Sequence, residues 1–280
     1  MTHSHAPSSN PVSIPISRYT TKRGLKQVTD LVSVEQPLEL RIRGRSIAIT
    51  MRTPGHDQEL AAGFVVSEGI VTHPEQIVEI AHCKRSEATH PENIINVFLT
   101  QDTVCEWEHL SRHVFASSSC GICGKASIEA IQSKWPPIES SFSLKLPILR
   151  ELSNRLIETQ SEFQQTGGLH AAALFRSDGS LICIREDVGR HNAVDKVIGW
   201  SLLNKAFPLT DSFLLVSSRA SFEIMQKALA ARIPLVAAVS APSSLAVEFA
   251  HENRQTLVGF VRESSFNIYS HPERVRDSSA

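Results

Sequence analysis

Two cysteines, Cys120 and Cys123, lie close together in a segment of small and polar residues. Serines precede the pair and glycines flank it, which predicts an exposed loop. From residue 125 to 134 the apolar residues recur at helical spacing, so the loop should lead into a helix N-terminus. The helix dipole and the Lys125 ammonium would favour the thiolate form of a cysteine. The pair therefore predicts a sulfur nucleophile on a loop that can carry it between sites.

Other roles for the cysteine pair fit the sequence less well. A structural zinc site needs four ligands, usually from two such pairs, whereas Cys83, Cys105 and Cys183 are isolated. A buried structural cysteine needs apolar surroundings, which a Ser/Gly-rich loop does not offer. A thioredoxin-type pair would follow the first strand of its fold, but this pair comes about 120 residues into the chain.

A histidine and a glutamate upstream of the cysteine pair suggest a zinc-dependent deaminase as an alternative. The deaminase signature joins an H-x-E motif to a P-C-x-x-C motif, and His90-Pro91-Glu92 matches its first part. Ser119 replaces the proline, and the alternation from Asn93 onward predicts a strand where the signature needs a helix. His-Pro-Glu also occurs at 73–75 and 271–273. We keep the deaminase as a remote alternative and predict no metal ligands.

Length, composition and charge limit the class of protein. With 280 residues, the chain can form two domains or one domain with an added lobe. Hydrophobic residues make up 41% and charged residues 20%, which is typical of a globular protein in water. The net charge of -1 argues against a broad nucleic-acid or membrane surface. The sequence has no apolar run of 18 residues and no signal peptide, and its cysteines are scattered, so we expect a cytoplasmic protein.

The first half of the chain predicts a small α+β lobe over residues 18–115, preceded by a disordered tail at 1–17. Its strands show alternation of period two, and Asp57 is placed to cap its helix. The expected elements are a strand at 38–43, a turn at 44–45, a strand at 46–51, a helix from 57 to 68, a strand at 93–100 and a short helix at 107–115. Residues 116–145 should hold the cysteine loop, its helix and a linker.

The second half, residues 146–270, predicts an α/β domain, and residues 271–280 a C-terminal tail. The expected helices are at 148–164, 192–205, 222–231 and 243–252, and the expected strands at 169–176, 181–185, 213–216, 235–239 and 256–261. Strands separated by such helices imply a mostly parallel sheet with helices on both faces. The hairpin signal at 177–180 makes this sheet mixed. We therefore expect a three-layer α/β/α sandwich.

Polar residues follow the predicted strands of this sheet, where open α/β sheets bind their ligands. Ser221 and Ser243 should cap helices. Capping does not explain Arg190 and Arg219, because the dipole at a helix start disfavours cations. Hydroxyls, arginines and free helix N-termini together predict an anionic ligand such as a phosphate. The residues predicted to bind it are Asp187, Arg190, His191, Ser218, Arg219 and Ser243.

Several motifs together resemble those of the formate dehydrogenase accessory sulfurtransferases, the FdhD family. They are Cys-Gly-Ile-Cys-Gly at 120–124, Thr-Gly-Gly-Leu-His-Ala-Ala-Ala at 166–173, Glu-Asp-Val-Gly-Arg-His-Asn-Ala-Val-Asp-Lys at 186–196, Val-Ser-Ser-Arg-Ala-Ser-Phe-Glu at 216–223, and Gly-Phe-Val-Arg at 259–262 with Tyr-Ser-His-Pro at 269–272. The resemblance extends over residues 38–274.

The resemblance implies a function. Proteins of this family accept persulfide sulfur from a cysteine desulfurase and pass it to the molybdenum cofactor, bis-molybdopterin guanine dinucleotide, before the cofactor enters formate dehydrogenase. Cys120 matches the persulfide position, and Cys123 would assist. A chaperone that only binds the cofactor is the alternative. The resemblance also implies a cytidine deaminase-like C-terminal fold and a homodimer.

The resemblance further implies a cofactor-binding stretch that follows the last strand of the sheet. Its residues are Phe260, Val261, Arg262, Glu263, Ser264 and Ser265. Many family members carry a glycine and a basic residue near the two serines. Here Glu263 instead adds a negative charge beside the expected pyrophosphate site.

Overall fold

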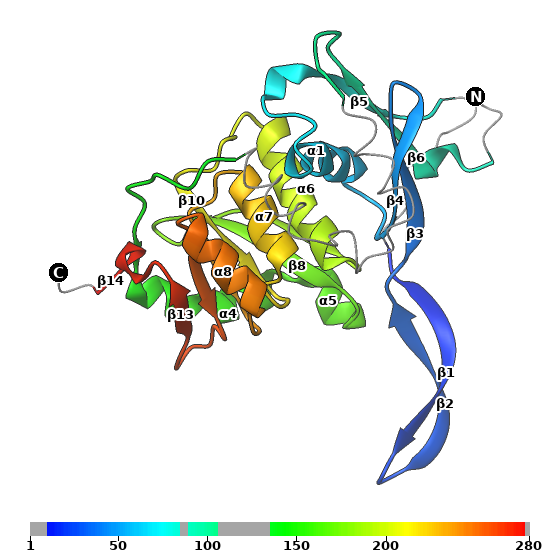
Figure 1. Ribbon diagram of the computed structural model, residues 1–280. Helices are drawn as coiled ribbons and strands as arrows, with labels where there is room; N and C mark the ends of the chain where they lie inside the picture. Colours follow the sequence, from blue (N-terminus) through cyan, green and yellow to red (C-terminus); the bar gives the residue numbers. More distant parts are fainter. Residues whose placement is uncertain (1–9, 85–88, 106–134, 278–280) are drawn as a thin grey trace.

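The computed structural model of the chain describes residues 10–84, 89–105 and 135–277 (Figure 1). The cysteine loop and the helices predicted at 107–115 and 125–134 lie outside these ranges. The part that is described contains a six-stranded and a four-stranded sheet, two two-stranded sheets and six α-helices. No helix within it is long and apolar enough to cross a membrane.

The larger sheet has six strands in the order β13-β12-β11-β10-β8-β9. Strands β10, β11 and β12 are parallel, whereas β8 and β13 run antiparallel to their neighbours. The prediction of a mixed sheet opened by a hairpin is confirmed by the pairing of β8 with β9. The strands are β8 (His170–Arg176), β9 (Leu181–Asp187), β10 (Ser212–Val216), β11 (Leu235–Ala238), β12 (Thr256–Gly259) and β13 (Asn267–Ser270).

Helices cover both faces of this sheet, because alternate strand residues point to opposite sides. In β10, Leu214 and Val216 belong to one apolar cluster and Phe213 and Leu215 to another. The first cluster lies under α6 (Arg190–Leu203), α7 (Phe222–Ala230) and α8 (Ser244–Glu252). The second lies under α4 (Leu146–Thr159), which is followed by α5 (Ser161–Thr166). The expected three layers are present, while the closer likeness to cytidine deaminases stays a prediction.

A second sheet of four strands, in the order β4-β3-β6-β5, forms the N-terminal part (Figure 1). The predicted hairpin is confirmed, but its turn lies at Arg43 and Gly44, where φ is 50° and 79°, rather than at 44–45. The alternation in β3 buries Leu38, Leu40 and Ile42 completely. The elements are β3 (Gln36–Ile42), β4 (Arg45–Arg52), α1 (Asp57–Ser67), β5 (Ile77–His82) and β6 (Ile94–Leu99).

The two parts of the chain meet where α1 crosses α6. A Cβ atom at Gly63 would lie 1.8 Å from the carbonyl oxygen of Asp195, and one at Gly199 would lie 1.8 Å from that of Glu59. Only glycine at both positions allows this approach. The buried residues of the four-stranded sheet, α1, α6, α7 and α8 form one continuous apolar core. The N-terminal part therefore depends on the C-terminal part for its packing.

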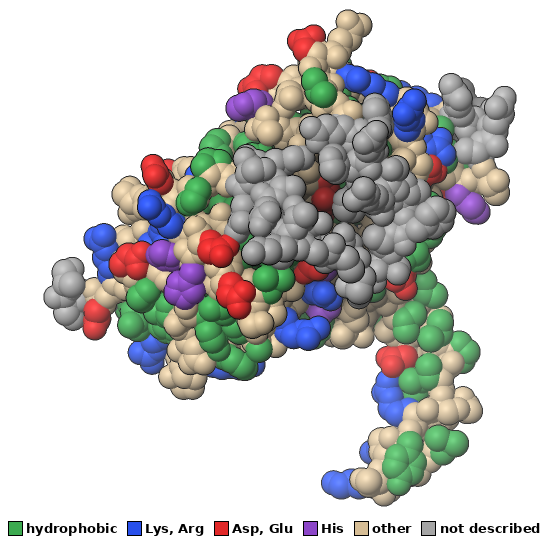
Figure 2. Space-filling view, in the orientation of Figure 1, with side chains coloured by type: hydrophobic (Ala, Val, Ile, Leu, Met, Phe, Trp, Pro, Cys, Tyr) green, Lys and Arg blue, Asp and Glu red, His purple; other side chains and the backbone are tan. Residues whose placement is uncertain are grey.

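A two-stranded arm, β1 (Val12–Thr20) and β2 (Gly24–Val32), projects from the body (Figures 1 and 2). The expected disordered tail is therefore wrong from Val12 onward. The alternation of Val12, Ile14 and Ile16 with polar residues or proline has the period of a strand, and an edge strand can accept Pro15, which has no N–H to donate.

Two further expectations need correction. Asp57 does not cap α1, because the N-cap is His56 in a left-handed conformation and the Asp57 carboxylate instead pairs with the buried Arg52 at 3.0 Å. The helix expected at 148–164 breaks at Gln160 into α4 and α5. Strands β5 and β13, and the short pair β7 (Leu144–Lys145) and β14 (Val275–Arg276), were not predicted.

Candidate functional site

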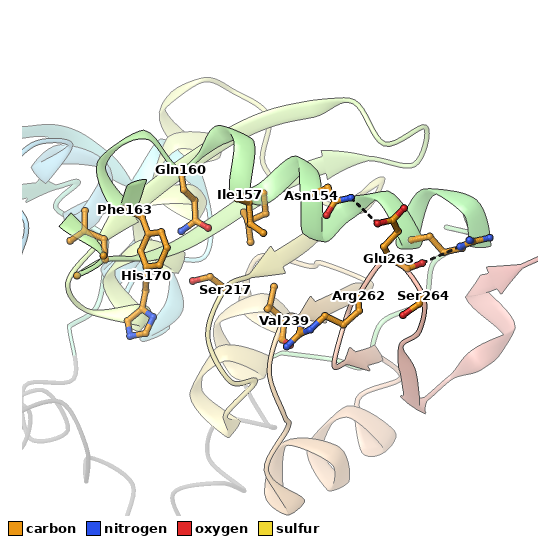
Figure 3. Close-up of a pocket in the computed structure, with 15 residues that line it drawn as sticks. Asn154, Ile157, Gln160, Phe163, His170, Ser217, Val239, Arg262, Glu263 and Ser264 are labelled. Carbon is orange, nitrogen blue, oxygen red and sulfur yellow. Dashed lines mark hydrogen bonds between the residues drawn. The ribbon is translucent and has the colours of Figure 1, made fainter. Parts of the chain in front are cut away.

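A cavity of about 960 Å³ opens at the carboxyl ends of β10, β11 and β12 (Figure 3). Ser217 and Val239, which follow β10 and β11, form one wall. Helices α4 and α5, with Gly167 and Gly168 after them, form the other wall. Open α/β folds bind their ligands at the carboxyl ends of the strands, and the volume of this cavity falls in the range of small-molecule sites.

A guanidinium group is held at one end of the cavity. Arg262, just beyond β12, donates from Nη1 to the carbonyl oxygens of Val239 at 2.6 Å and of Val261 at 2.8 Å. Its Nη2 and Nε have no hydrogen-bond partner among the described residues. Because the head group is anchored by one nitrogen and open at the others, it can donate to an anionic ligand.

The same end of the cavity also carries the carboxylate of Glu263. Its Oε2 accepts a hydrogen bond of 3.4 Å from Asn154, and its backbone oxygen accepts one of 3.2 Å from Arg150. Both donors come from α4, so this helix draws Glu263 toward itself. Arg150, Ser264 and Arg262 also line this end, which leaves two cations to one carboxylate.

The opposite end of the cavity is more apolar and aromatic. Phe163 of α5 and His170 at the start of β8 lie there, with the Gln160 side chain between α4 and α5 (Figure 3). Gly167, with φ of 67°, ends α5 in the left-handed conformation that glycine adopts most easily. Burial and the nearby Arg190 lower the pKa of His170, so its ring is neutral near pH 7.

The predicted cofactor-binding residues divide between this cavity and other surroundings. Arg262, Glu263 and Ser264 line it. Val261 is buried, and the backbone oxygen of Ser265 closes a turn by accepting from Arg262 N at 2.9 Å. The residues predicted from the other strand ends do not line the cavity: Asp187, Arg190, His191, Ser218, Arg219 and Ser243. Phe260 is also outside it, and Cys120 and Cys123 lie outside the described residues.

Serines at the helix starts were expected to act as caps. Ser243 does so, because its Oγ accepts from Ala246 N of α8 at 3.3 Å. Ser221 occupies the N-cap position of α7, but its side chain makes no capping hydrogen bond, so that expectation is wrong. Ser218 donates to the backbone oxygen of Arg219, whose side chain is exposed.

Asp187 is engaged inside the protein. It is fully buried and pairs with Lys196 Nζ at 2.7 Å. It also accepts from Thr53 N at 3.2 Å, Gly189 N at 2.8 Å and Asn192 Nδ2 at 3.0 Å. By accepting these hydrogen bonds, the Asp187 carboxylate connects the end of β4 to the start of α6. Asp187 therefore connects two parts of the fold rather than facing the cavity.

A second buried ion pair joins the same two parts of the chain. Lys227 of α7 lies 2.8 Å from Asp195 of α6 and donates to Ser67 Oγ of α1 at 2.8 Å. Glu68 is 3.6 Å away. Burial alone would lower the pKa of Lys227, but the carboxylates of Asp195 and Glu68 outweigh burial and raise it. Lys227 therefore stays charged at the junction of three helices.

Arg190 and His191, in contrast, keep unused hydrogen-bonding groups. Arg190 Nε and His191 Nε2 are buried without a hydrogen-bond partner among the described residues. His191 Nε2 lies 3.8 Å from a carboxylate oxygen of Glu223. Burial, with the charges of Lys227 and Arg190, lowers the pKa of His191 to about 4, although Glu223 opposes the shift.

His191 should therefore make the stability of the protein depend on pH. In the unfolded chain it binds a proton below about 6.5, its ordinary pKa, but in the folded protein only near pH 4. The free energy of unfolding should thus fall as the pH drops from 6.5 toward 4. Above pH 6.5 the contribution of His191 to stability should have its full value. Urea denaturation across this range should show a smaller fall for His191→Gln than for the wild type. Equal falls would contradict the assignment.

Sequence reasoning missed the α4–α5 wall of the cavity, which supplies Arg150, Asn154, Gln160 and Phe163. The motif at 166–173 was the available signal, since its glycines and His170 line the cavity. In the part that the structure describes, no group of three or more His, Cys, Asp or Glu side chains is placed to hold a metal.

The chain matches known proteins over most of its length. Residues 33–276 match the model of the FdhD/NarQ family. A protein of Streptomyces coelicolor named sulfur carrier protein FdhD is 49% identical over 251 residues, which cover 88% of this chain and 89% of the relative. A protein of the same name from Mycolicibacterium paratuberculosis is 45% identical over 264 residues, covering 93% and 97%.

A solved structure shares the fold. The crystal structure of a proposed formate dehydrogenase accessory protein from Desulfotalea psychrophila matches with a TM-score of 0.76 and 24% identity, over 95% of this chain and 100% of that one. The structural match and the two relatives agree with the sequence motifs. From the family model matched over residues 33–276, we conclude that the chain belongs to the FdhD/NarQ family.

Proposed function

We propose that this protein is a sulfur carrier that serves formate dehydrogenase and holds a nucleotide-bearing molybdenum cofactor as its substrate. The names of its relatives support the carrier role. The single observation that supports the substrate is the cavity, because it combines a cationic end at Arg262 with an aromatic end at Phe163. One nucleotide half of bis-molybdopterin guanine dinucleotide carries phosphates, which suit the cationic end, and a base, which suits the aromatic end.

In this proposal the Cys120 thiolate attacks the outer sulfur of a persulfide on a cysteine desulfurase. A new S–S bond forms on Cys120, and the thiolate of the desulfurase leaves with the electron pair of the broken bond. Cys120 would then give up this sulfur before the cofactor enters formate dehydrogenase: the Cys123 thiolate attacks the Cys120 sulfur, a disulfide forms between the two cysteines, and the outer sulfur leaves for the cofactor as sulfide with the electron pair of the broken bond. The protein would act in the cytoplasm as a homodimer.

In this proposal the chain's own residues have distinct tasks. Arg262 and Arg150 bind the phosphates, because they bring positive charge to one end of the cavity. Glu263 is drawn toward α4 by Asn154, which limits its repulsion of the ligand. A chaperone that only binds the cofactor would use the same cavity, so sulfur uptake by Cys120 decides between the two functions.

Arg262→Ala should weaken the binding of GDP, a stand-in for one end of the cofactor, by about tenfold to a hundredfold. This is the loss of one charge-assisted contact, about 1.5–3 kcal/mol. Titration calorimetry on the full chain measures it. Arg176→Ala is the matched control, because Arg176 is exposed at the other end of β8 and should leave the affinity unchanged.

Equal GDP affinity in the wild type and Arg262→Ala would remove Arg262 from the site. The role predicted for Arg219 can be measured in the same series. Because Arg219 does not line the cavity, Arg219→Ala distinguishes a phosphate site at Arg262 from one at the start of α7. An effect of Arg219→Ala as large as that of Arg262→Ala would move the phosphate site to the start of α7.

A further inference from the structure

The two-stranded arm, β1 and β2, has two chemically different faces. In a strand pair, alternate rows of side chains point to opposite sides, and the register places Arg18, Lys26 and Asp30 on one of them. The other face carries no charge. Its residues are Ser13, Pro15, Ser17, Tyr19, Leu25, Gln27, Thr29 and Leu31. Depletion of charged residues is typical of the centre of a protein–protein interface.

The uncharged face of the arm exposes large apolar side chains. Tyr19 and Leu25 lie opposite each other and are each 69% exposed, and Leu31 is 38% exposed. None of the three belongs to or packs against an apolar core of the described residues. Between them, Gln27 donates to Ser17 Oγ at 2.8 Å, a hydrogen bond that burial would not break. The face therefore has the apolar anchors and the paired polar groups that an interface needs.

The arm stands apart from the body of the protein. It extends beyond the end of the four-stranded sheet (Figures 1 and 2). Its base is tied to α5, where Ser33 Oγ and Thr166 Oγ1 are 2.7 Å apart. An isolated pair of strands is at best marginally stable in water. We therefore expect another surface to pack against the arm.

The four-stranded sheet offers such a surface on its outer face, at its β4 edge. Pro37, Ile49 and Met51 share this face, and Met51 lies directly opposite Pro37 in the register. Ile49 is 44% and Met51 47% exposed, and neither packs against an apolar core of the described residues. We call these three residues the β4 patch. Within one chain the arm extends away from this sheet and leaves both surfaces exposed, so they are free to meet between two copies.

Charge and area both favour a second copy of the chain as the partner. Residues 12–32 carry four cations and one carboxylate, a net charge of +3, whereas the whole chain has -1, so the remainder carries -4. Opposite charges steer the arm toward another body. A hairpin face about 30 Å long and about 10 Å wide buries about 600 Å² over both partners, so two contacts bury about 1,200 Å², the lower limit for a stable interface. A twofold dimer makes each contact twice.

We propose that the arm joins two copies of the chain, with its uncharged face packed on the β4 patch of the second copy, whose own arm returns the contact. Tyr19 and Leu25 are the anchors on the arm. Ile49 and Met51 receive them. This inference rests on the homodimer of the proposed function and adds the two surfaces that form it.

Light scattering of the full chain at micromolar concentration tests the inference, and the wild type should have the mass of two chains. Leu25→Lys puts a positive charge on the uncharged face, and Met51→Asp puts a negative charge on the β4 patch. Each variant should weaken the dimer by about a hundredfold or more and become monomeric, because both symmetric contacts lose an anchor. An equimolar mixture of the two variants should form dimers again, since one contact is then native and the other joins opposite charges.

Each variant has a matched control. Val28→Lys adds the same charge to the opposite face of the arm, because Val28 pairs with Ile16 in the other set of rows. Val78→Asp adds the same charge at a residue that is 68% exposed on β5, the opposite edge of the four-stranded sheet. Both controls should remain dimers. Thermal melting of each variant checks that it is folded.

Three outcomes would overturn the inference. Dimers of Leu25→Lys and of Met51→Asp would show that other surfaces form the interface, while the homodimer would stand. Monomers that do not recombine in the mixture would show that the arm and the β4 patch do not meet. A wild-type monomer would overturn both the inference and the homodimer and would leave the arm to a different protein. Sulfur uptake by Cys120, measured by intact mass, tests the carrier function independently of all three.

Discussion

Cys120→Ala is expected to take up no sulfur and to abolish the activation of formate dehydrogenase, with the fold intact. The reason is chemical, since in the proposed function Cys120 supplies the thiolate that receives the persulfide sulfur. The sequence predicts that this thiol lies on an exposed loop and holds no core together, so we expect stability to be unchanged. Intact-protein mass after incubation with a cysteine desulfurase and cysteine should show one added sulfur on the wild type and none on the variant.

The other cysteines supply the controls. Burial raises the pKa of the Cys183 thiol to about 12, so it stays protonated and unreactive. Cys183→Ala and Cys83→Ala should both keep sulfur uptake and activation. Cys123→Ala should weaken or abolish activation. Normal activation by Cys120→Ala would show that the persulfide assignment is wrong, and activation without any added sulfur on the wild type would favour the chaperone.

Asp195→Ala is expected to lower the free energy of unfolding by about 3–5 kcal/mol, because it leaves the buried ammonium of Lys227 with only the more distant carboxylate of Glu68, 3.6 Å away. Lys227 is in contact with α6 through Asp195 and with α1 through Ser67, at 2.8 Å in each case. The variant therefore weakens the junction between the two parts of the chain. Chemical denaturation of the full chain measures the loss.

An exposed ion pair provides the comparison. Arg18 and Asp30 on the arm are 3.1 Å apart, with side chains 51% and 44% exposed. Asp30→Ala should cost about 0–1 kcal/mol, because water screens the pair. Replacing both partners of the buried pair, as Asp195→Leu with Lys227→Met, should recover much of the stability. A loss below about 1 kcal/mol for Asp195→Ala would contradict the structural role of the pair.

The sequence predicted best what depends on local patterns. The buried runs that form β10 and β11 were predicted, as were the turn at 177–180 and the β3–β4 hairpin, whose turn was placed one residue too late, because alternation and turn residues act within a few positions. Strand β13 was missed because its four residues, Asn-Ile-Tyr-Ser, form no apolar run, whereas the four residues of β11 are all apolar and buried. The helix break at Gln160 was missed because Glu186, which caps the new helix, belongs to a distant strand.

The candidate site shows the same limit. Arg262 was predicted from the resemblance to the FdhD family, within the stretch that follows the last strand, and it lines the cavity. Asp187 follows a strand too, but Lys196 neutralises it inside the fold. The sequence does contain a signal for this, since Lys196 and Lys227 are each followed by two apolar residues in their helices, and a buried lysine requires a carboxylate. Pairing the two lysines with Asp187 and Asp195 requires the fold.

The close crossing of α1 and α6 has a consequence for biosynthesis. Gly63 of α1 packs against the backbone of Asp195 in α6, and Ser67 of α1 accepts a hydrogen bond from the ammonium of Lys227 in α7. During translation, the first hundred residues therefore leave the ribosome before the surface that covers their apolar face exists. Contacts of such long sequence separation form late and slowly. The N-terminal part must be kept from aggregation until about four-fifths of the chain has been synthesised.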